Sequence, residues 1–263
     1  MKFGMPALVE CNDVYDCIAV AKKNSLDFVE INMSFPQYLP EAIDIPRLRA
    51  ALSDAGVFLT IHADEQLNPF DFNGEVSKCY FEVMKSAIRF AVALDIPVIN
   101  MHLLKGVYVT LPGKVILLTD VYKEQYFNRV REFIDMCERE IGDSRLKICI
   151  ENVDSNAFTE SQLEALKLFM ASSVFGLTLD VGHEMCLKMA DTHVFEKYPE
   201  KLVHMHLHDC DGKKPHLALG DGIMDIKAKI SAFCGETCLV EVKTIAGLEV
   251  SSEYLKEKGY IKR

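Results

Sequence analysis

The sequence predicts a single (β/α)8 barrel, the TIM-barrel class of α/β folds. Its 263 residues lie close to the roughly 250 that this fold typically takes. Short apolar runs alternate with longer amphipathic ones along the whole chain, a pattern typical of repeated βαβ units. The first apolar run is not followed by the glycine-rich phosphate loop that an open doubly wound sheet usually carries. No linker or low-complexity stretch interrupts the chain, so residues 1–263 are predicted to form one domain.

Eight short apolar runs are predicted to be the strands. Eight strand–helix units in 263 residues give about 33 residues per unit, which matches a βαβ repeat of about 30. In chain order the predicted strands are Lys2–Gly4, Asp27–Asn32, Val57–His62, Pro97–His102, Leu146–Glu151, Phe175–Asp180, Leu202–His208 and Cys238–Lys243.

The longer amphipathic runs between these strands are predicted to be helices. Thr159 is followed three residues later by Gln162, the spacing of a capping box at a helix start. Gly56 stands where a helix must end before the third strand. The predicted helices are Val14–Asn24, Pro46–Ala55, Val76–Leu94, Tyr122–Ile141, Glu160–Ala171 and Ile226–Phe233.

Composition narrows the possible partners and the compartment. The chain has 29 Lys plus Arg against 39 Asp plus Glu, a net charge of −10, so no basic field attracts nucleic acid or an anionic membrane. The nine cysteines are odd in number and form no C-x-x-C pair, which argues against a thiolate zinc site. With no signal peptide and no apolar run of about eighteen residues, we expect a cytoplasmic protein with reduced thiols.

Most of the predicted strands end in a charged or imidazole side chain, although buried parallel strands are normally almost wholly apolar. The carboxyl ends of barrel strands form one rim, where the chemistry of such enzymes lies. Of the eight histidines, His193 alone falls in a helix-like stretch. The polar residues at or just after strand ends are Glu30, His62, His102, Glu151, Asp180, His183, His204, His206, His208, His216 and Glu241.

Several carboxylates that converge on one rim cannot all stay ionised and unpaired, because burying an isolated charge is very costly. One divalent cation resolves this conflict, and oxygen ligands with one or two imidazoles suit Mn²⁺, Mg²⁺, Co²⁺ or Zn²⁺. Alternation along the seventh strand places His204, His206 and His208 on one face. We choose His206 as the ligand, while His204, which lies deepest, is equally compatible with a packed layer of the core.

Five short motifs, in this order along the chain, resemble the xylose-isomerase-like barrel superfamily. They are 150–152 (IEN), 179–183 (LDVGH), 206–209 (HLHD), 219–222 (LGDG) and 240–241 (VE). This superfamily includes sugar isomerases, ketose 3-epimerases, inosose dehydratases and apurinic-site endonucleases. In the isomerase and epimerase branch, the resemblance implies one divalent metal held by Glu151, Asp180, His206 and Glu241.

The same resemblance assigns roles around that metal. Glu151 and Glu241 are implied to act as acid and base, transferring a proton at the carbon beside a carbonyl through an enediolate. His183 is implied to contact oxygens of a carbohydrate or polyol substrate. In the endonuclease branch, histidines at the positions of His62, His102 and His216 bind additional zinc ions. Here Lys214 stands two residues before His216, where that branch carries an aspartate, so these histidines are assigned to substrate binding instead.

Three functions remain open from the sequence. The first is a metal-dependent isomerase or epimerase of a sugar, keto-sugar or polyol, with dehydration as a variant of the same step. The second is a zinc-dependent phosphodiesterase of endonuclease type, which His62, His102 and His216 favour and the acidic charge opposes. The third is a barrel that binds a metabolite without turnover, because fold does not fix function. Homo-oligomers are common in this superfamily, so the resemblance allows a homo-oligomer here, although no apolar stripe in the sequence indicates one.

The number of bound metal ions separates these functions. We expect elemental analysis of the purified protein to find one divalent ion per chain. Two or three ions per chain would favour the phosphodiesterase, and a metal-free protein that still binds a metabolite would favour the third function.

Overall fold

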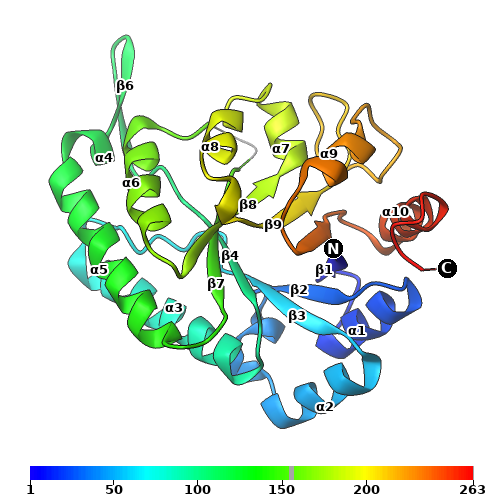
Figure 1. The fold of residues 1–263 in the computed structure, drawn as a ribbon. Helices are drawn as coiled ribbons and strands as arrows, with labels where there is room; N and C mark the ends of the chain where they lie inside the picture. Colours follow the sequence, from blue (N-terminus) through cyan, green and yellow to red (C-terminus); the bar gives the residue numbers. More distant parts are fainter. Residues whose placement is uncertain (154–156, 263) are drawn as a thin grey trace.

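The computed structural model describes residues 1–153 and 157–262, and it forms a closed barrel of eight parallel strands (Figure 1). Around the barrel, neighbouring strands follow the order β1-β10-β9-β8-β7-β4-β3-β2. The predicted fold class is therefore confirmed. The barrel strands are β1 (Lys2–Pro6), β2 (Phe28–Asn32), β3 (Phe58–His62), β4 (Val98–His102), β7 (Lys147–Glu151), β8 (Phe175–Asp180), β9 (Leu202–Leu207) and β10 (Thr237–Val240).

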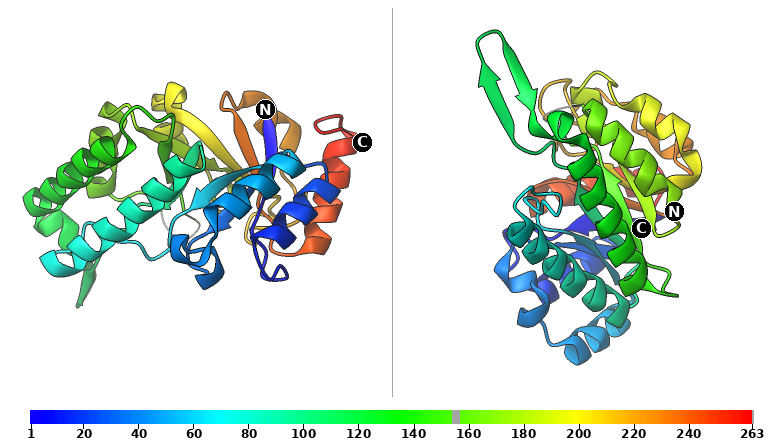
Figure 2. Two further views of the ribbon diagram at one scale, coloured as in Figure 1. Left: turned by 90° about the horizontal axis from the view of Figure 1, so that it is seen from below. Right: turned by 90° about the vertical axis from the view of Figure 1, so that its left-hand side faces the viewer.

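Helices follow the strands and cover the outside of the barrel (Figures 1 and 2). The capping box at Thr159 and Gln162 is present at the start of α6, and Gly56 ends α2 with a φ of 69°, which a residue with a side chain adopts at a cost. The helices are α1 (Val14–Lys23), α2 (Ile45–Ala55), α3 (Gly74–Ala93), α4 (Leu118–Val121), α5 (Lys123–Ile141), α6 (Glu160–Ala171), α7 (Val181–Cys186), α8 (Thr192–Lys197), α9 (Ile226–Ala232) and α10 (Ile245–Glu257), with short 3₁₀ turns at Pro36–Tyr38, Pro40–Ala42 and Pro199–Lys201.

The structure adds elements that the apolar pattern did not predict, namely the helices α4, α7, α8 and α10 and an antiparallel hairpin. The hairpin, β5 (Tyr108–Leu111) and β6 (Lys114–Leu117), lies between β4 and α4. The hairpin turns at Pro112 and Gly113, and it projects away from the barrel (Figure 2). Its strands are largely solvent-exposed, so the apolar residues of this segment do not pack into the core.

The main core lies between the outer face of the barrel and the helices. Large side chains from several helices are fully buried there, among them Leu48 of α2, Ile88 of α3, Phe133 of α5 and Phe169 of α6. No helix in the described part of the chain is both long and apolar enough to span a membrane.

One close approach between neighbouring strands depends on a glycine. Gly4 of β1 pairs with Phe28 of β2, and a methyl group on Gly4 would overlap the Phe28 ring, which is itself fully buried. The Phe28 ring also stacks on Phe58 of β3, with ring centroids 5.1 Å apart. The ring has little room to move, so Gly4 allows β1 and β2 to pack at the base of the barrel.

We therefore expect Gly4→Ala to destabilise the protein by about 1–3 kcal/mol, the usual cost of overpacking a core. Gly74→Ala is the control, because its added methyl group would meet only the end of the Arg129 side chain. Chemical denaturation of both variants measures the two effects. Equal stability of the two variants would contradict this account of the packing.

Candidate metal centre

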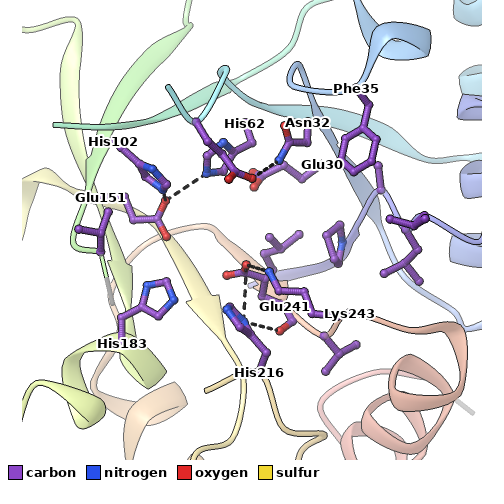
Figure 3. Close-up of a pocket in the computed structure, with 18 residues that line it drawn as sticks. Glu30, Asn32, Phe35, His62, His102, Glu151, His183, His216, Glu241 and Lys243 are labelled. Carbon is purple, nitrogen blue, oxygen red and sulfur yellow. Dashed lines mark hydrogen bonds and ion pairs between the residues drawn. The ribbon is translucent and has the colours of Figure 1, made fainter. Parts of the chain in front are cut away.

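A pocket of about 370 Å³ opens at the carboxyl ends of the barrel strands (Figure 3). Side chains from strand ends all around the barrel line it, so the closed sheet brings together residues that are far apart in the sequence. The residues implied by the sequence that line it directly are His62, His102, Glu151, His183, His216 and Glu241. Asp180 and His206 are buried beside them, at 0% and 1% exposure.

The structure brings Glu151, Asp180, His206 and Glu241 together, with one ligand atom of each within 4.8 Å of the others. His206 Nδ1 is the centre of this group. It lies 2.9 Å from Glu151 Oε1, 3.0 Å from Glu241 Oε2 and 3.9 Å from Asp180 Oδ2. Three carboxylates from β7, β8 and the residue after β10 therefore face one imidazole nitrogen of β9.

Asp180 is held in place by the backbone of its own helix and by residues that follow the two neighbouring strands, β7 and β9. Its Oδ1 accepts a hydrogen bond of 2.7 Å from the backbone N–H of His183, so Asp180 caps α7. The Asn152 amide bonds to both the N–H and the carbonyl oxygen of Asp180, at 2.9 Å each. His208 Nε2 lies 3.0 Å from Asp180 Oδ1. A side chain at Gly182 would overlap the His208 ring, which explains the glycine at this position.

The four other histidines implied by the sequence form two groups around this centre. His62 and His102 each place Nε2 3.4 Å from Oε2 of Glu151, which also accepts a hydrogen bond from Asn100. On the other side, His183 Nδ1 lies 3.2 Å from Asp180 and His216 Nδ1 lies 3.6 Å from Glu241. Figure 3 shows the two groups on opposite sides of the pocket.

The charges of the centre depend on one another. Burial alone disfavours the ionised form of every group, yet His206 holds the pKa of Glu151 and that of Glu241 well below the usual range. Burial likewise opposes protonation of His206, but Glu151, Glu30 and Glu241 together hold its pKa well above the usual value. The carboxylates therefore remain ionised only with a positive charge among them.

A divalent cation fits this arrangement. His206 Nδ1 and Glu241 Oε2 are buried and make no hydrogen bond with the described part of the chain, although the two atoms lie only 3.0 Å apart. Buried polar atoms normally have a partner. Carboxylate oxygens with one imidazole are ligands that suit Mn²⁺, Mg²⁺, Co²⁺ and Zn²⁺.

Several residues at the site were not assigned a role from the sequence. Lys243 Nζ lies 2.7 Å from Glu241 Oε1, and Glu30 of β2 contacts the histidines of β9. Nothing in the sequence pairs Glu30 with β9, since barrel closure alone brings them together. Phe35, which follows β2, also lines the pocket.

The fold and the site define a class of barrel protein, and comparison with known proteins agrees with that class. Residues 18–249 match the family model of the xylose isomerase-like TIM barrel. The chain belongs to this family.

Individual relatives are more distant. The chain is 26% identical to the uncharacterized protein MJ1311 of Methanocaldococcus jannaschii, over 98% of this chain and 89% of that protein. A D-tagatose 3-epimerase-like protein of known structure is 26% identical, with a TM-score of 0.76 over 98% of this chain and 96% of that one. The IolI protein, crystallised with a zinc atom, is 15% identical with a TM-score of 0.74, covering 100% of both chains, which shows the shared fold.

The protonation of His62 gives the metal-free protein a pH-dependent stability. Burial lowers the pKa of His62, but Glu151 more than offsets this and raises it to about 9, against about 6.5 in an unfolded chain. The stability that comes from protonated His62 is therefore fully present below pH 6.5 and is lost as the pH rises through 9.

We expect the melting temperature of the metal-free protein to fall between pH 6.5 and 9.5, and to fall less steeply in His62→Asn. Thermal unfolding in the presence of a chelator, at several pH values, measures both slopes. Parallel slopes for the two proteins would show that His62 is not protonated at the site.

Proposed function

We propose that this protein is a metal-dependent isomerase or epimerase of a sugar, keto-sugar or polyol. The observation that supports this proposal most directly is the meeting of Glu151, Asp180, His206 and Glu241 at one point of the barrel rim. The similarity to a D-tagatose 3-epimerase-like protein supports the class of substrate, and a zinc atom in the crystal structure of IolI, a protein of the same fold, supports metal binding.

Under this proposal, Glu151, Asp180, His206 and Glu241 hold one Mn²⁺, Co²⁺, Mg²⁺ or Zn²⁺ ion. When bound, the ion acts as a Lewis acid that stabilises negative charge on neighbouring substrate oxygens. Glu151, Asp180 and His206 are buried and lie on strands, and Glu241 directly follows β10 and is half-buried, so the side chains that would hold the ion are firmly placed. Such rigidity favours a reaction in which charge develops on the substrate at a fixed position.

The two glutamates move the proton. Glu151 and Glu241 approach His206 Nδ1 from two different segments, at 2.9 and 3.0 Å, so they flank the same space. One removes the proton from the carbon beside a carbonyl, leaving an enediolate, and the other returns a proton to the opposite face in an epimerisation. Lys243 beside Glu241, and His62 and His102 beside Glu151, give the two carboxylates different surroundings. This difference allows one to act as the base while the other acts as the acid.

The outer histidines are placed to bind substrate. His62, His102, His183 and His216 all line the pocket around the carboxylates, and their ring nitrogens can bond the hydroxyl groups of a carbohydrate or polyol. Burial, the largest influence, and neighbouring His208 and Lys243 together lower the pKa of His216 to about 4. His216 is therefore neutral near pH 7 and presents one donor and one acceptor.

A zinc phosphodiesterase is the second candidate, and one observation favours it. His62, His102 and Glu151 form a further group whose ligand atoms lie within 4.8 Å of one another. Against it stands Lys214, which is exposed and offers no carboxylate to the group of His183, His208 and His216. The net charge of −10 also opposes binding to DNA. We therefore favour the carbohydrate reaction. We further propose that the protein acts in the cytoplasm and as a homo-oligomer.

The proton transfer predicts a defined loss of activity. In D₂O with Mn²⁺, the wild type is expected to introduce deuterium at the α-carbon of a ketose from a panel that includes D-tagatose. Glu151→Gln and Glu241→Gln are each expected to slow this exchange by about 10²–10⁴-fold, the usual contribution of one acid or base. Proton NMR of the recovered sugars measures the exchange.

Glu184→Gln serves as the control. Glu184 is buried in α7 and bonds to Thr192 rather than to the four residues of the centre. The Glu184→Gln variant is therefore expected to exchange deuterium at the wild-type rate. Exchange at the wild-type rate in Glu151→Gln or Glu241→Gln would rule out this mechanism.

A further inference from the structure

Glu30 is a buried carboxylate that the proposed reaction does not use. It lies on β2, across the barrel from the carboxylates of the metal centre, and its side chain is 2% exposed. No lysine or arginine pairs with it among the described ion pairs. Its partners are Thr60, whose hydroxyl donates to Oε2 at 2.8 Å, and two histidines of β9. Each Nε2 lies 3.2 Å from a Glu30 oxygen but makes no hydrogen bond with the described part of the chain. A buried carboxylate favours a hydrogen on the nitrogens that face it, because it needs donors.

His206 offers its two ring nitrogens to different partners. Nδ1 faces Glu151, Asp180 and Glu241, at 2.9–3.9 Å, whereas Nε2 lies 3.2 Å from Oε1 of Glu30. A neutral imidazole carries one N–H and one lone pair. A carboxylate opposite Nε2 favours the tautomer with its hydrogen there, which leaves the lone pair of Nδ1 directed at the metal centre.

His204 completes the surroundings of Glu30. Its Nε2 lies 3.2 Å from Oε2 of Glu30, and its Nδ1 lies 2.7 Å from the hydroxyl of Thr237. The Thr237 hydroxyl also donates to the carbonyl oxygen of Val203 at 3.4 Å, so the role of His204 rests on its position beside Glu30. Glu30 is thus surrounded by the hydroxyl of Thr60, which donates to it, and by two imidazole nitrogens that lie 3.2 Å away.

We propose that Glu30 is the positioning residue of the metal centre: it fixes His206 in the tautomer and ring orientation that direct the Nδ1 lone pair at the cation. His204 and Thr60 in turn hold the Glu30 carboxylate in place. This inference rests on the proposed metal binding. A carboxylate that accepts the second N–H of a metal-bound histidine typically improves metal affinity 10- to 100-fold.

The first test is a direct observation on the wild type. In protein labelled with ¹⁵N-histidine and loaded with Zn²⁺, long-range ¹H–¹⁵N spectra show which ring nitrogen carries the hydrogen. We expect His206 to carry it on Nε2, with its signals assigned by their absence in His206→Asn. A hydrogen on Nδ1 of His206 would overturn the inference, whatever the behaviour of any variant.

The second test is metal affinity. Glu30→Gln keeps the shape of the side chain but removes its charge and replaces one carboxylate oxygen by an NH₂ group, which donates and cannot accept an N–H. We expect its dissociation constants for Mn²⁺ and Zn²⁺, measured by competition with a chelating dye, to rise 10- to 100-fold. Glu184→Gln makes the same change in another buried glutamate, which bonds to Thr192 and contacts neither Glu30 nor His206. We expect this control to stay within about threefold of the wild type.

The outcomes separate this inference from the proposed function. A wild type that binds neither ion would overturn both proposals. If Glu30→Gln binds metal as tightly as the wild type does, the role of Glu30 alone is overturned. The same holds if Glu184→Gln loses as much metal affinity as Glu30→Gln. Thermal unfolding of the metal-free variants shows whether Glu30→Gln is folded. If it is not, the tautomer of His206 in the wild type decides the question.

Discussion

The site depends on the confinement of several carboxylates around His206 Nδ1, where water cannot screen them. In the interior of a protein, charges of like sign repel strongly and each ion loses its hydration. Three carboxylates within reach of one imidazole nitrogen are compatible with a stable fold only if positive charge lies among them. The metal-free protein supplies protons on its histidines, and a divalent cation supplies the same charge at any pH at which the carboxylates are ionised. The arrangement of the surrounding residues follows from this requirement.

The barrel explains how these charges are brought together at acceptable cost. Most strands carry one or two polar residues at or just after their ends, while preceding residues of the same strand are buried and apolar, as in Ile148 and Ile150 before Glu151. The stability of the core offsets the cost of a polar rim. Backbone groups also help to fix the rim, as in the capping of α7 by Asp180. Gly182 then lets His208 lie against the first turn of that helix.

Much of this could be predicted from the sequence, because residues at strand ends converge whenever parallel strands close into a barrel. Glu151 and Asp180 end their strands as predicted, and the prediction needed only the strand boundaries to within a residue. Contacts between side chains on opposite sides of the barrel were not predictable in the same way. Glu30 and His204 meet only because β2 and β9 face each other across the interior, and no local pattern encodes that distance. The hairpin of Tyr108–Leu117 was missed because its apolar residues are exposed, whereas the predictions took apolar runs to be buried.

Strand β9, the seventh strand of the barrel along the chain, places three histidines on one side, and each has a different role. His204, His206 and His208 alternate onto one side of β9 and its extension, and each meets different partners because each lies at a different depth. His204 contacts Thr237 and Glu30 in the interior, His206 meets the three carboxylates, and His208 contacts Asp180 nearer the exit. The deepest and the outermost histidine each contact a carboxylate that also faces the middle one. A strand that carried His206 alone would present the same imidazole nitrogen to the carboxylates, but Glu30 and Asp180 would each lose a neighbouring histidine. Under the proposed function, the repeated histidines are one ligand and two groups that hold its surroundings in place.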